Sequence, residues 1–81
     1  MTEVELVFER IVDIPKFIET HGENTLHIEL VGVPSVQEEL YFYDDESDME
    51  IAFRVIRIEH IVHRLYGGAL KSHVNVMIRR I

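Results

Sequence analysis

Five histidines in 81 residues are the first side chains whose chemistry could serve a function. His60 and His63 stand three positions apart, a spacing that would place both rings on one face of a helix and suit a metal ion. On a strand the same two rings face opposite sides, and no third ligand follows at a matching spacing. We therefore expect no metal and no other cofactor. Together with Arg64 and His73, the two histidines are candidate contacts for an anionic group on a small ligand.

Acidic side chains alternate along residues 44–50, as they do in oxygen-rich calcium loops. A loop of the EF-hand type would need glycine where Met49 stands and a bidentate acid where Val55 stands. Both are missing. Residues 44–48 are therefore predicted to be a solvated hairpin loop.

Catalytic motifs are absent. Ser35, Ser47 and Ser72 lie in no nucleophile-elbow sequence, and Gly67-Gly68 is followed by Ala-Leu-Lys rather than by the Gly-Lys-Ser/Thr of a phosphate loop. A domain of this size also has little depth for a sheltered pocket. We expect no enzymatic activity.

The charge differs sharply between the two halves of the chain. Residues 1–50 carry fourteen acidic side chains against two basic ones, net −12, while residues 51–81 carry six basic against one acidic, net +5, which gives the overall −7. This asymmetry suits an acidic surface aimed at a basic partner, head-to-tail self-association, or neutralisation between neighbouring strands. Nucleic-acid binding is not expected, because Tyr41 and Tyr43 lie among acids that repel phosphate. An acidic mimic of nucleic acid that occupies a basic protein is an alternative.

The compartment is predicted from three absences. The chain has no cysteine, its first residues are acidic where a signal peptide needs positive charge, and no apolar run approaches the roughly 18 residues of a membrane span. We expect a cytoplasmic protein.

Alternation of apolar and polar residues predicts most of the elements. It covers residues 3–14, 25–33, 36–43 and 73–79, with one short helical turn near 15–21 that starts at Pro15 and is closed by Gly22. Phe17 and Ile18 are expected to plug one end of the sheet. No linker divides the chain, so residues 1–81 form a single domain.

Residues 49–66 fit two periods. Apolar residues spaced by four and three, with a capping box from Ser47 to Glu50, indicate a helix. Alternation with one β-bulge, together with the many β-branched residues, indicates a strand. A hairpin through the acidic loop would also pair like with like and acid with base: Glu39 with Arg54, Leu40 with Phe53, and Phe42 with Ile51. We favour the strand.

The predicted fold is mainly β, a small five-stranded antiparallel sheet or partly open barrel; the alternative is an α+β fold with a helix at about 49–66. Several apolar residues face outward on this interpretation, more than a small monomer should leave exposed: Val7, Ile11, Val31, Tyr41, Tyr43, Ile61 and Met77. We therefore predict a self-associating protein-interaction module with a regulatory, inhibitory or assembly role. Its predicted interaction surface comprises Tyr41, Tyr43, Glu39, Arg54 and Met77. The alternative is a binder of a small anionic ligand or nucleotide at a subunit interface.

Overall fold

The computed structural model describes all residues from Met1 to Ile81 and contains five strands and one short 3-10 turn. Their bounds are β1 (Thr2–Phe8), η1 (Ile11–Asp13), β2 (Thr25–Leu30), β3 (Glu39–Asp44), β4 (Met49–Arg64) and β5 (Leu70–Arg80).

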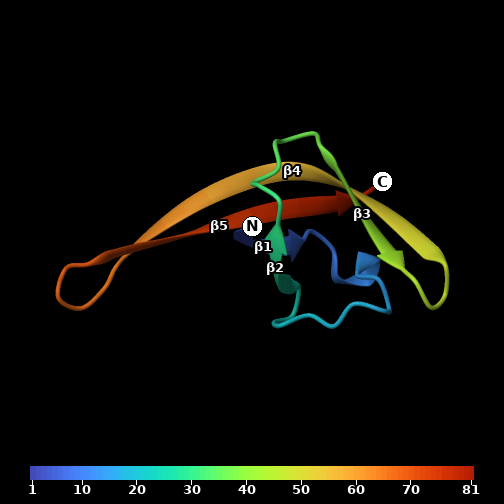
Figure 1. Cartoon of the computed structure of the whole chain (residues 1–81), viewed down its shortest axis with the longest axis horizontal. Helices are drawn as coiled ribbons and strands as arrows, with labels where there is room; N and C mark the ends of the chain where they lie inside the picture. The colour runs from blue at the N-terminus through green and yellow to red at the C-terminus, as the bar shows by residue number, and fades with distance from the viewer.

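The strands form one sheet in the order β2-β1-β5-β4-β3, curved into a half-barrel (Figure 1). The predicted mainly β fold is confirmed. One pairing differs from the antiparallel expectation, because β1 and β5 run parallel, with Leu6 opposite Val76 and Phe8 opposite Ile78. Alternation along a strand predicts which side chains share a face, but it does not predict which strand lies next to it.

The hairpin between β3 and β4 has the predicted register. Glu39 lies opposite Arg54, Leu40 opposite Phe53 and Phe42 opposite Ile51. The helical alternative for residues 49–66 is wrong, because Met49–Arg64 is one continuous strand. The predicted bulge is present between Val55 and Arg57, and it keeps both Val55 and Ile58 on the core side of the sheet.

The core lies on the concave side of the half-barrel, in a cluster of eight buried residues from β1, β4 and β5. Phe8 contacts Phe53 edge-on with ring centroids 5.3 Å apart, and Phe42 of β3 meets Phe53 in the same way. Such aromatic pairs add stability beyond the apolar area they bury. Ile14 and Phe17 pack against this cluster from the loop between β1 and β2. Phe17 therefore contacts the core as expected, whereas Ile18 is not among the residues packed against it.

Residues 9–24 depart from the predicted layout. The first strand ends at Phe8 rather than near Ile14. Its pairing with β2 ends at Val7, and its last backbone hydrogen bond to β5 is from the Glu9 N–H to the Ile78 carbonyl. The helical turn lies at Ile11–Asp13, ahead of the predicted 15–21. Within 15–21 the chain makes only one tight turn, in which the Ile18 N–H donates to the Pro15 carbonyl at 3.0 Å.

The other strand limits also shift. The second strand ends at Leu30 and the third begins at Glu39, so both are shorter than predicted, whereas the last begins at Leu70 and is longer. The extra length of β4 and β5 carries a two-stranded hairpin away from the half-barrel (Figure 1) and gives the molecule its extents of 48 × 24 × 24 Å.

Candidate functional site: the arm formed by β4 and β5

Residues 56–74, here called the arm, form the part of the β4–β5 hairpin that no other strand covers. Hydrogen bonding between β4 and the segment leading into β3 stops at Val55, and pairing between β5 and β1 begins only at Asn75. Both edges of the arm are therefore bare. It carries three basic side chains against one acidic, net +2, whereas the rest of the chain carries net −9.

The core face of the sheet continues along the arm without a cover. Ile58 and Val74 still pack against the core, and every second residue beyond them faces the same way. On this face Val62 and Leu70 are 62% and 71% exposed, while Val55 and Val76, in the same two strands, are fully buried. The apolar strip on the core face of the arm comprises Ile58, Val62, Leu70 and Val74.

The tip of the arm is a tight turn that requires glycine. Gly67 and Gly68 have φ values of +89° and +86°, in the left-handed region that disfavours a side chain. The Leu65 N–H donates to the Ala69 carbonyl at 2.8 Å and closes the turn. Tyr66 projects from it with its side chain entirely exposed.

His63 and His73 meet on the opposite, outer face of the arm. Nε2 of His63 lies 3.2 Å from Nδ1 of His73, and the two rings stack with centroids 5.0 Å apart. His60 and Arg64 belong to the core face, as a strand requires. The four predicted ligand contacts therefore fall into two groups on opposite faces and do not form one site. No three histidine or acidic side chains gather closely enough to hold a metal ion.

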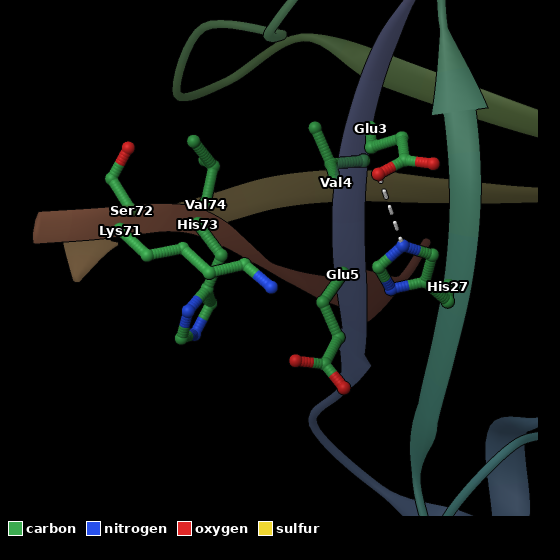
Figure 2. A pocket seen from close by; sticks show the side chains of 8 residues that line it. All are labelled: Glu3, Val4, Glu5, His27, Lys71, Ser72, His73 and Val74. Carbon is green, nitrogen blue, oxygen red and sulfur yellow. Dashed lines mark ion pairs between the residues drawn. The ribbon is translucent and has the colours of Figure 1, made fainter. Parts of the chain in front are cut away.

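A hollow of about 430 Å³ separates the base of the arm from the start of β1 (Figure 2). Polar side chains line most of it: Glu3, Glu5, His27, Lys71, Ser72 and His73. Glu3 and His27 approach each other to 3.7 Å across β1 and β2. The hollow lies where β1 and β5 diverge, beyond the pair of Glu5 with Asn75.

The predicted tyrosine surface lies at the other end of the molecule, on the outer face of β3. Tyr41 and Tyr43 are 57% and 54% exposed, and their hydroxyls donate to the carboxylates of Glu39 and Asp48. Arg54 also donates to Glu39, at 3.2 Å. The hydrogen bond from Tyr41, followed by that from Arg54, lowers the pKa of Glu39. Correspondingly, the hydrogen bond to Glu39 raises the pKa of Tyr41.

Met77 does not join this surface. It lies in the middle of the outer face, opposite Val7 of β1 and Arg57 of β4, and is only partly exposed. Val7 and Ile61 are likewise half-buried, whereas Ile11 and Val31 are exposed as predicted.

Part of the charge asymmetry is neutralised inside the molecule. The Arg79 guanidinium donates hydrogen bonds of 2.8–3.1 Å to the Glu9 carboxylate, and Arg54 pairs with Glu39. Two basic residues of the second half of the chain thus pair with acidic residues of the first half. Arg57 pairs with Glu59 within its own strand. The Glu9–Arg79 pair was not predicted, because it depends on the parallel contact between β1 and β5.

Val62, Tyr66 and Leu70 were also missed as candidate interaction residues. The feature of the sequence that could have indicated them is the length of the two alternating runs on either side of Gly67-Gly68. Both strands exceed the usual five or six residues, so their ends extend beyond the rest of the sheet.

Comparisons with protein-family models, curated proteins and solved structures found no match to this chain. The structure contains no helix that is long and apolar enough to cross a membrane.

Proposed function

We propose that this chain is a small non-enzymatic protein-interaction module that self-associates through the arm. The observation that supports the proposal is the apolar strip. Val62 and Leu70 are exposed on the same face of the same two strands that bury Val55 and Val76 completely. An isolated two-stranded hairpin is at best marginally stable in water, so a projecting arm gains stability from a partner. Only ten of 81 residues are buried, which leaves the single chain with a thin core of its own.

Charge favours a second copy of the chain as that partner. The arm carries net +2, and the remainder of the molecule carries net −9. The opposite net charges therefore attract the arm of one copy towards the remainder of a second copy and favour their encounter.

The mass in solution tests this proposal. We expect light scattering to give twice the 9.5 kDa mass of the chain. Val62→Asp combined with Leu70→Asp places charge on the apolar strip and should give the monomer mass. The matched control is Val31→Asp, because Val31 is 92% exposed outside the arm and its replacement should leave the dimer intact. A monomer mass for the unmodified chain at high concentration would refute self-association.

The tyrosine surface supports a second binding role, for a different protein partner. Tyr41 and Tyr43 are exposed side by side on β3, and tyrosine is enriched at protein interfaces. A regulatory, inhibitory or assembly role would follow from such a partner. Tyr41→Ala with Tyr43→Ala should abolish capture of that partner without changing the mass in solution.

A further inference from the structure

The direction of the backbone groups on β4 shows which residues face its bare edge. The Val55 carbonyl accepts from the Gln37 N–H and the Val55 N–H donates to the Glu38 carbonyl, so Val55 points away from β5. At the far end the Leu65 N–H donates to Ala69 and so points towards β5. Between the bulge and this turn the direction alternates. Four residues therefore present unpaired N–H and C=O groups to solvent: Ile58, His60, Val62 and Arg64.

This edge differs from the other free edges of the sheet. The four residues that present backbone groups to this edge include no acid and one base, Arg64 near the tip. The edge strands β2 and β3 carry Glu29 and Glu39 at the positions that face their free edges. Charges on an edge strand oppose edge-to-edge pairing. The bare edge of β5 spans only residues 70–74, and the start of β1 lies across the hollow from it. The β4 edge, residues 56–64, has no such neighbour.

We propose that two copies of the chain pair antiparallel along their β4 edges, about a twofold axis at His60. This inference rests on the proposed self-association and names the surface that performs it. With His60 opposite His60 of the second copy, Ile58 of each chain lies opposite Val62 of the other. Outward-pointing backbone groups then meet outward-pointing groups, as antiparallel hydrogen bonding requires.

Side-chain chemistry selects this register over its neighbours. A shift that centres the axis on Glu59 places the two copies' Glu59 carboxylates opposite each other, which is unfavourable. A shift to Ile61 places Ile58 opposite Arg64 and Val62 opposite His60, so no apolar pair forms. In the register centred on His60, Arg64 lies opposite Ile56, but Ile58 and Val62 pair twice. An axis that lies between two consecutive residues places core-face residues of one copy opposite outer-face residues of the other. Only the register centred on His60 joins the apolar strips of both arms on one face and extends the half-barrel into a continuous sheet.

Disulfide trapping tests the register, and the absence of native cysteine gives a clean background. In the proposed pairing the Cα atoms of the two His60 residues stand about 5.5 Å apart, within the range that a disulfide spans. We expect His60→Cys to form a covalent dimer on mild oxidation with diamide. Val62→Cys is the matched control on the same face, because its two copies lie four residues apart along the strands, about 13 Å. Ser72→Cys reports on pairing through the β5 edge instead.

The outcomes separate this inference from the proposed function. A dimer mass with fast cross-linking of His60→Cys alone supports both. A dimer mass with cross-linking at Ser72→Cys, at Val62→Cys as fast as at His60→Cys, or at none of the three overturns the pairing and leaves self-association standing. A monomer mass overturns both. Melting of each reduced variant at the temperature of the unmodified chain shows that it is folded.

Discussion

At the scale of single residues, the ion pair between Glu9 and Arg79 joins positions 70 apart in the sequence. Hydrogen bonding from Arg79 is the main cause that lowers the pKa of Glu9 below its ordinary value of 4.5, and the same bond raises the pKa of Arg79. The pair spans the parallel contact of β1 and β5, since the Glu9 N–H also donates to the Ile78 carbonyl at 2.9 Å. Both side chains reach solvent, so their role is to fix register more than to add stability.

We expect Arg79→Gln to raise the pKa of Glu9 towards 4.5. Folding lowers this pKa, so the unfolded chain takes up the proton at a higher pH than the folded chain does. The contribution of the pair to stability is therefore complete above pH 4.5 and disappears as the pH falls through the lower, folded value. Titration of the Glu9 carboxyl carbon by NMR measures the shift. Arg80→Gln is the control, because Arg80 forms no ion pair; an unchanged Glu9 pKa in Arg79→Gln would contradict the assignment.

At the scale of elements, the arm depends on the turn at its tip. Gly67 and Gly68 both adopt positive φ, whereas Gly32 lies in an open loop without that constraint. Space is available beside all three, so steric contact does not distinguish them.

Gly67→Ala should lower the free energy of unfolding by about 1 kcal/mol, the cost of holding a side chain in the left-handed region. Gly32→Ala should cause no loss. Denaturant unfolding of the two variants at equal concentration measures the difference. Equal midpoints would show that the turn can open at no cost.

The alternation within each strand could be predicted from the sequence, whereas the neighbours of each strand could not. Alternation predicted the core faces of β1, β2 and β3. Pairing acid with base and apolar with apolar predicted the register that joins Glu39 to Arg54. Residues 49–66 satisfied two periods because the bulge after Val55 interrupts the alternation. The arm was not predicted, because Val62 and Leu70 follow the same alternation as buried strand residues. Their exposure depends on which strands stand beside them, and that is a property of the assembled sheet.

At the scale of the whole molecule, the half-barrel buries few residues and the arm extends its longest dimension to 48 Å. The proposed pairing through β4 would enclose backbone groups that are bare in the single chain. It adds hydrogen bonds without burying a new acid, because Glu59 faces the outer side.

Hydrogen exchange of the arm should therefore depend on protein concentration. On dilution to the monomer we expect the amides of His60 and Val62, which point to the bare edge, to exchange at least tenfold faster. The amides of Glu59 and Ile61 point towards β5 and should change less. NMR or mass-spectrometric exchange at two concentrations makes the comparison. Equal acceleration of all four amides would indicate that the arm unfolds as a unit on dissociation.

The strand order has a consequence for how the chain reaches its native state. β5 lies in the centre of the sheet, between β1 and β4, although it is the last strand along the sequence. The β3–β4 and β4–β5 hairpins can close early from local contacts, but the β1–β2 pair has no neighbour until β1 pairs with β5. Pairing of Phe8 with Ile78 closes a long loop, and such non-local closure slows folding. Until then the Val4, Leu6 and Phe8 face is open to aggregation, so the last strand controls the lifetime of the vulnerable intermediate.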